Sequence, residues 1–217
     1  MIIKTFLIYL LLLASALTVA SESNREYYYT VNKIYGFKLS DSKIHEVFEY
    51  FGLTHPTFHE EKHELAEACI RNNDASLGLV LITGVIHDYE TLYGYRLTSK
   101  PKEDCLVSEK ITSENSGVIP LGSNGAKIVT TLGGPNTISS EEAAWKLKLT
   151  IPWDEPIVRS WKAGPEGKKY TQVQTISGEH HTVLISAKFT GDHLSEFEVI
   201  DYAESDFKIE NVHDQKI

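Results

Sequence analysis

Three histidines with regular spacing are the residues best suited to bind a metal. His55, His59 and His63 recur every four residues, with glutamates among and after them. On a helix this spacing would place the three imidazoles on one face, and imidazole with carboxylate suits zinc. Pro56, however, disfavours a helical conformation at His55. We therefore expect a solvated acidic connection between a helix and a strand here, with a metal site as the alternative, and no cofactor.

Motifs typical of enzymes are not found in the sequence. No serine lies in a G-x-S-x-G motif, which would mark a nucleophile elbow. Residues 164–169 (GPEGKK) have the composition of a phosphate loop but lack its spacing and the Ser or Thr after the lysine. They predict a tight hairpin instead. We therefore expect a protein without enzymatic activity.

The two cysteines, Cys69 and Cys105, are not in a C-x-x-C arrangement. In an oxidising compartment an even pair predicts a disulfide, with two buried thiols as the alternative. Such a bridge would contribute roughly 3–4 kcal/mol to stability in the chain-entropy treatment.

The first 20 residues have the layout of a secretory signal peptide. Lys4 precedes an apolar run, and small residues end at Ala20. The uncharged stretch is short for a membrane span, which needs roughly 20 apolar residues. Cleavage would leave Ser21 as the first residue, while retention as an uncleaved anchor is the alternative. We expect a periplasmic or secreted protein with no stable membrane insertion after cleavage.

Composition narrows the range of partners. Charged residues make up 24% and hydrophobic residues 41% of the chain, as in globular proteins. The formal net charge is −9. An acidic surface repels nucleic acid and anionic lipid, so we expect neither as the main partner.

A repeated pattern gives the expected domain organisation. Residues 36–52 and 117–135 each show an apolar entry, a small polar residue, one short helix and a glycine stop. The expected caps and stops are Ser42, Ser123, Gly52 and Gly133. Alternating or apolar runs after each helix predict antiparallel strands. These runs are residues 64–71, 77–86, 91–99, 144–151, 158–163, 170–177, 182–189 and 194–202, with turns at 164–167, 178–180 and 191–192.

The predicted fold class is α+β, with two tandem units of short helices packed on an antiparallel sheet. The expected divisions are a signal peptide (1–20), a first unit (21–110), a second unit (111–203) and a loosely held acidic tail (204–217).

The repeated entry, helix and glycine stop resemble the beta-lactamase-inhibitor-protein fold and the small outer-membrane assembly lipoproteins that share its unit. The resemblance spans most of residues 35–201. It implies that helices pack on one face of each sheet, that the sheets form a concave protein-binding surface, and that Cys69 and Cys105 form the disulfide of the first unit. The second unit has no cysteine, which departs from the inhibitor pattern.

Aromatic residues on predicted strands are the remaining functional clue, because exposed aromatics often anchor protein partners. The candidates for protein binding are Tyr93, Tyr95, Trp145 and Trp161, with core packing as the alternative for each. By the two-residue period, Tyr93 and Tyr95 should share one sheet face. The leading hypothesis is a secreted or periplasmic, non-enzymatic, inhibitor-like protein-binding module. The alternatives are an envelope structural or assembly factor and a His-rich metal-binding protein.

Overall fold

The computed structural model describes residues 26–54, 58–60, 65–84, 90–112, 119–163 and 170–212. The predicted signal peptide, its cleavage site, the hairpin at 164–169 and the residues His55 and His63 lie outside this part of the chain. Among the described residues, no helix is both long and apolar enough to cross a membrane.

Short helices and a large sheet make up the structure, which confirms the α+β class. A short helix covers residues 26–31. The other helices are α2 (Ile44–Tyr50) and α3 (Gly125–Leu132). The strands are β1 (Lys33–Ile34), β2 (Phe37–Lys38), β3 (His59–Glu60), β4 (Leu65–Arg71), β5 (Gly78–Gly84), β6 (Leu92–Thr98), β7 (Leu106–Val107), β8 (Thr137–Ile138), β9 (Glu142–Ala163), β10 (Tyr170–Thr190) and β11 (His193–Val212).

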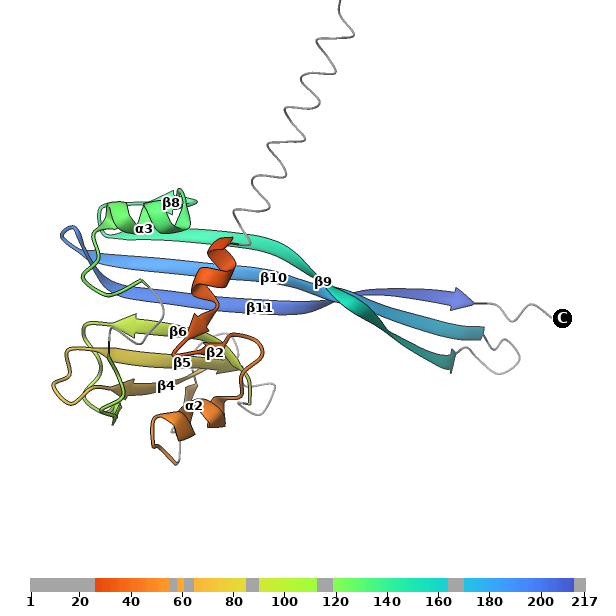
Figure 1. The fold of residues 1–217 in the computed structure, drawn as a ribbon, viewed down its shortest axis with the longest axis horizontal. Helices are drawn as coiled ribbons and strands as arrows, with labels where there is room; N and C mark the ends of the chain where they lie inside the picture. Colours follow the sequence, from red (N-terminus) through yellow and green to blue (C-terminus); the bar gives the residue numbers. More distant parts are fainter. Residues whose placement is uncertain are drawn as a thin grey trace, which may run out of the picture. The chain divides into compact units, whose positions relative to one another are not determined.

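Most strands join one nine-stranded sheet in the order β3-β4-β5-β6-β11-β10-β9-β8 (Figure 1). The pairings of β4 with β5, β5 with β6 and β6 with β11 are antiparallel. β7 pairs with β4 in parallel, so the sheet is mixed. β1 and β2 form a separate two-stranded sheet.

The chain divides into two compact units. Unit 1 comprises residues 1–147 and 183–202, and unit 2 comprises residues 148–182 and 203–217. The bounds of β9, β10 and β11 give each of these strands residues in both units. The sequence pattern predicts a boundary near residue 110 instead, and that boundary stays a prediction.

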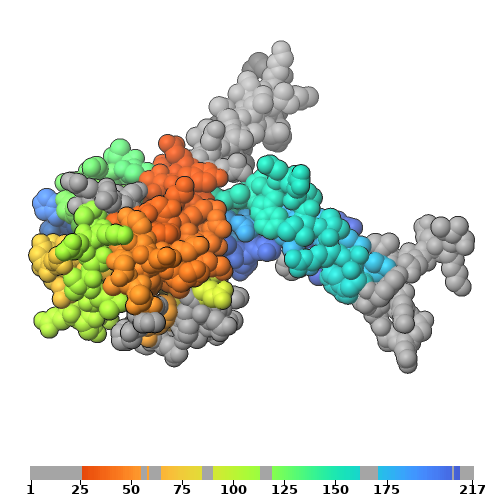
Figure 2. All heavy atoms as spheres, turned by 60° about the horizontal axis from the view of Figure 1, so that its bottom comes forward, coloured from red at the N-terminus to blue at the C-terminus, as the bar shows by residue number. Residues whose placement is uncertain are grey.

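The core of unit 1 lies between its helices and one face of its strands. In β4, buried and half-buried residues alternate along the whole strand, as expected when one face is covered. Ile44, Val47 and Phe48 of α2 are buried, and so is Phe51 just after the helix. This confirms the helical face predicted from their spacing. Figure 2 shows the orange N-terminal residues gathered on one side of unit 1.

The predicted helix stops are correct, but the predicted caps are wrong. Gly52 and Gly133 end α2 and α3 with φ of +74° and +77°, a conformation that favours glycine. The N-caps are Lys43 and Asn124. The Ser42 hydroxyl instead accepts a hydrogen bond from the Lys38 amide (2.9 Å), because the chain turns there before the helix begins.

Two strand breaks predicted between residues 144 and 189 are not found. Gly178-Glu179-His180 is not a turn but part of β10. A Cβ on Gly178 would lie 2.5 Å from the Ile151 carbonyl oxygen, so this glycine allows close approach of two strands. β9 also continues through Pro152 and Pro156. β8 pairs only with Ala143 and Ala144 of β9, so this later part of β9 is a sheet edge, which tolerates residues that lack an amide proton.

Residues 204–212 of the predicted loose acidic tail form the end of β11 instead, while residues 213–217 lie outside the described part of the chain. Between residues 204 and 210, charged residues alternate with other residues. This is the two-residue period of a strand. The turn predicted at residues 191–192 is confirmed, with Gly191 at φ +62°.

Candidate protein-binding site

Two of the four candidate aromatics belong to the core of unit 1. Tyr95 is fully buried on β6, and its hydroxyl donates a hydrogen bond to the Val31 carbonyl (3.0 Å). Burial raises the pKa of Tyr95 well above its ordinary value. Trp145 is buried on β9, and its indole nitrogen donates to the Gly133 carbonyl (3.0 Å). Neither ring faces solvent, which corrects their assignment as binding anchors.

Tyr93 lies on the face of the sheet opposite to Tyr95. In the pairing of β5 with β6, Ile82 is opposite Gly94 and Thr83 is opposite Leu92, so the register skips Tyr93. Such a bulge interrupts the alternation of side chains. A Cβ on Gly84 would lie 2.9 Å from the Tyr93 ring, so this ring covers the face to which Gly84 points. The prediction that Tyr93 and Tyr95 share a face is therefore wrong.

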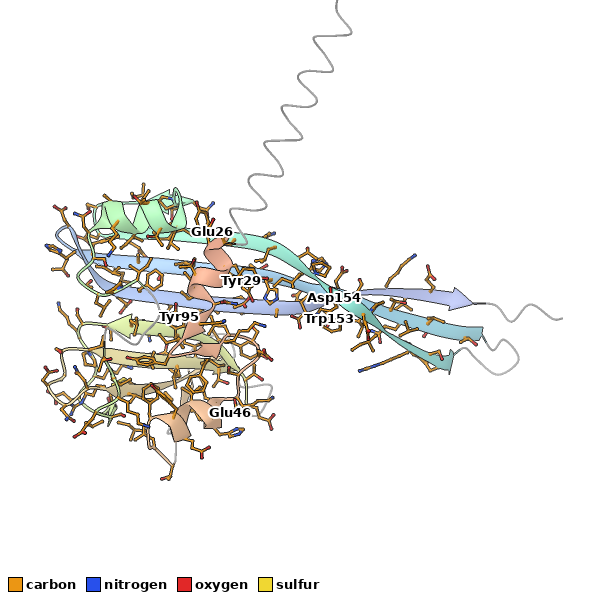
Figure 3. The ribbon with its side chains drawn as sticks, in the orientation of Figure 1. Glu26, Tyr29, Glu46, Tyr95, Trp153 and Asp154 are labelled. Carbon is orange, nitrogen blue, oxygen red and sulfur yellow. A yellow bond between two sulfur atoms is a disulfide. The ribbon has the colours of Figure 1, made fainter. Side chains whose placement is uncertain are left out.

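The face that carries Tyr93 is opposite to the one covered by the N-terminal helix. That helix contacts the covered face, where the Tyr28 hydroxyl donates to the Asp201 carboxylate (3.2 Å) and Tyr95 reaches Val31. Figure 3 labels Tyr95 and Tyr29 of this region. We call the other side the open face of unit 1. It carries Glu67, Tyr93, Arg96, Leu184, Lys188, Glu196 and Glu198, whereas the β5 residues on this side of the sheet are buried.

A charged network crosses the open face from β4 to β11. The guanidinium of Arg96 donates to both carboxylate oxygens of Glu67 (2.6 and 2.5 Å) and to Glu198 (3.2 Å). Burial raises the pKa of Glu198 despite the opposing effect of Arg96. Lys188 donates to Glu196 (2.6 Å), and this hydrogen bond raises the pKa of Lys188. The charges are thus held in place by one another.

Two hollows lie on the open face. The first has a volume of about 540 Å³ and includes Cys69, Val80, Arg96, Pro101 and Leu106 in its lining. The second, of about 390 Å³, includes Lys146, Leu184, Ser186, Glu198 and Ile200. A mixed-charge surface with shallow hollows and an arginine can accept side chains of a protein partner.

The predicted disulfide is confirmed. Cys69 of β4 is bonded to Cys105, which lies just before β7. The bridge ties the segment after β6 to β4, and the same segment contributes Pro101 and Leu106 to the first hollow. The disulfide therefore supports one wall of that hollow.

The histidine pattern is not helical where it is described. His59 lies in β3, where it pairs with Glu67 of β4, so the helix assumed for the metal site is wrong at this residue. Within the described part of the chain, no group of three or more His, Cys, Asp or Glu side chains could hold a metal ion. The metal hypothesis gains no support from these residues.

Unit 2 holds the fourth candidate, Trp161, together with a polar cluster that sequence reasoning missed. The Trp161 side chain is 40% exposed. The cluster joins three strands: Thr150 Oγ1 lies 2.8 Å from His180 Nδ1, and His180 Nε2 lies 3.2 Å from Asp206 Oδ1. Its members are about 30 residues apart, so no local motif could reveal them. His180 and Asp206 are both exposed, and we interpret the cluster as a cross-strand link.

Comparison with protein family models, with curated proteins and with solved structures finds no match to this chain.

Proposed function

We propose that this chain is an exported protein-binding module and that the open face of unit 1 is its binding surface. The observation that carries the proposal is this face itself: a broad sheet surface with a half-buried tyrosine, an ion-paired arginine and two hollows. Tyrosine and arginine are the residue types that most often dominate binding energy at protein interfaces.

The predicted export of the protein is a second, independent argument for the proposal. The sequence predicts a signal peptide, and a disulfide such as Cys69–Cys105 persists in oxidising compartments. A periplasmic or secreted location, the tandem arrangement of two units and the beta-lactamase-inhibitor-like family all belong to this proposal. In that family, helices on one side of a sheet leave the other side for a protein partner, and unit 1 has this division of its faces.

Site-specific photo-crosslinking in the producing cells tests the proposal. A photoreactive amino acid at Tyr93 or Leu184, both on the open face, should give a discrete adduct with another protein. The same amino acid at Tyr29, on the helix that covers the other face, should not. Adducts of the same kind from all three positions, or none from the open face, would contradict the proposal.

A matched pair of substitutions links the adduct to the surface. Leu184→Asp introduces a charge on the open face and should abolish the adduct formed from Tyr93. Ile138→Asp introduces the same charge at an exposed aliphatic residue of β8 and should leave it intact. Far-UV circular dichroism would establish that both variants fold.

A further inference from the structure

Unit 2 has two chemically different faces, and one of them is an exposed apolar surface. Thr150, His180 and Asp206 mark the polar face, because their side chains are in contact. Since side chains alternate along a strand, Asp154 and Val158 follow Thr150 on the polar face. Odd-numbered residues such as Trp153 point to the other side, and Figure 3 labels the neighbours Trp153 and Asp154 on β9.

The second face carries large apolar side chains from β9 and β11. β9 contributes Trp153, Ile157 and Trp161, and β11 contributes Ile209, which alternates with Asp206. Ile157 is 42%, Trp161 40% and Ile209 48% exposed. We call this second face the apolar face of unit 2.

The order of residues on this face is self-complementary. Along β9 it is Trp153, Glu155, Ile157, Arg159 and Trp161. From either end, the order is a tryptophan, a charged residue and the central isoleucine. The two charged residues have opposite signs. An antiparallel copy centred on Ile157 would therefore bring Glu155 against Arg159 and Trp153 against Trp161. A two-fold interface requires such a surface, in which each residue meets its counterpart.

We propose that two copies of this chain form a dimer through the apolar face of unit 2. The two-fold axis passes near Ile157, perpendicular to the strands and between the two sheets. The apolar side chains are then buried between aligned sheets, as in a β-sandwich, and two Glu155–Arg159 pairs flank them. This inference goes beyond the proposed function and uses a different surface, so either can fail without the other.

Packing of faces is favoured over pairing of the β9 edges. The Ala144 carbonyl accepts from the Asn136 amide (2.8 Å) on the side away from β10. By alternation, the backbone groups of other even-numbered residues of β9 point to that same edge. Pro152 and Pro156 are among them and have no amide proton, so the edge lacks two of the donors that strand pairing would need.

Sedimentation analysis of the mature protein, with charge exchange, tests the dimer. The wild type should dimerise at micromolar concentration. Glu155→Arg and Arg159→Glu should each raise the dimer dissociation constant at least about tenfold, because like charges then face each other. The double exchange, Glu155→Arg with Arg159→Glu, should restore dimerisation, since it re-forms both pairs.

The matched control is Asp154→Arg, which makes the same change of charge on the polar face and should leave the dimer intact. A wild type that stays monomeric at about 100 µM would overturn the proposal. So would a double exchange that dimerises no better than the single variants, or a control that dissociates the dimer as strongly as Glu155→Arg. Circular dichroism of each variant separates loss of the dimer from loss of folding.

Discussion

Units 1 and 2 contain parts of the same three strands but differ in what covers them. In unit 1, one face of β9, β10 and β11 is buried, as Trp145, Ile185 and Val199 show. In unit 2, Ile157, Trp161 and Ile209 are exposed. An antiparallel sheet becomes stable when one face is covered by helices or by another sheet. The difference therefore indicates that unit 1 is stabilised by its own core, whereas the described residues leave apolar side chains of unit 2 exposed.

The largest expected effect on stability comes from a substitution in the core of unit 1. Tyr95→Ala should lower the free energy of unfolding by about 3–5 kcal/mol, because it leaves a cavity and removes the hydrogen bond to Val31. Tyr202→Ala is the control, since Tyr202 is exposed and should change stability by about 0.5 kcal/mol or less. Urea unfolding measures both, and equal losses would mean that Tyr95 is not a core residue.

The next effect removes the covalent link within unit 1. Replacing Cys69 and Cys105 together with alanine should cost roughly 2–4 kcal/mol, because the unfolded chain is no longer constrained by the bridge. Reduction of the wild type should give a comparable loss in urea unfolding. A change below about 1 kcal/mol would show that the bridge contributes little to unit 1.

A smaller effect concerns the charges of the two units. Arg96→Ala leaves the half-buried carboxylates of Glu67 and Glu198 without their shared partner and should cost about 2–3 kcal/mol. Lys208→Ala removes a fully exposed ion pair with Glu210 in unit 2 and should leave the unfolding midpoint unchanged. Equal shifts in the two variants would contradict the contrast between the units.

The smallest effect is a dependence on pH within the open face. Burial raises the pKa of Glu198 above its ordinary value of 4.5, so the protonated form is favoured on folding. The stability that this group contributes is fully present below pH 4.5 and is lost as pH rises through its folded pKa. Glutamine does not titrate, so Glu198→Gln should not show this pH-dependent loss of stability.

Urea midpoints of the wild type and of Glu198→Gln at about pH 4 and about pH 7 measure the effect. At the higher pH, the urea midpoint of the wild type should be lower, relative to that of Glu198→Gln, than it is at the lower pH. A wild-type midpoint that rises relative to that of the variant would mean that attraction to Arg96 outweighs the effect of burial on Glu198.

Local sequence patterns determined the helices and most strands of unit 1. Apolar residues at helical spacing located α2 and α3, and alternating or apolar runs located β4, β5 and β6, because both signals depend on near neighbours in the chain. The caps were misjudged because Ser42 takes part in the turn that precedes α2. The disulfide was predictable since the chain has one cysteine pair.

Tertiary structure alone decided which aromatics are exposed and how far the last three strands run. Tyr93 and Tyr95 point to opposite faces because a bulge forms only when β5 pairs with β6. Gly178, Pro152 and the acidic segment after residue 203 resemble strand breaks by type. Gly178 and the acidic segment are tolerated because of the neighbouring strand, and Pro152 is tolerated because it lies at a sheet edge. Burial and strand pairing depend on residues far apart in the chain, so they could not be derived from local sequence.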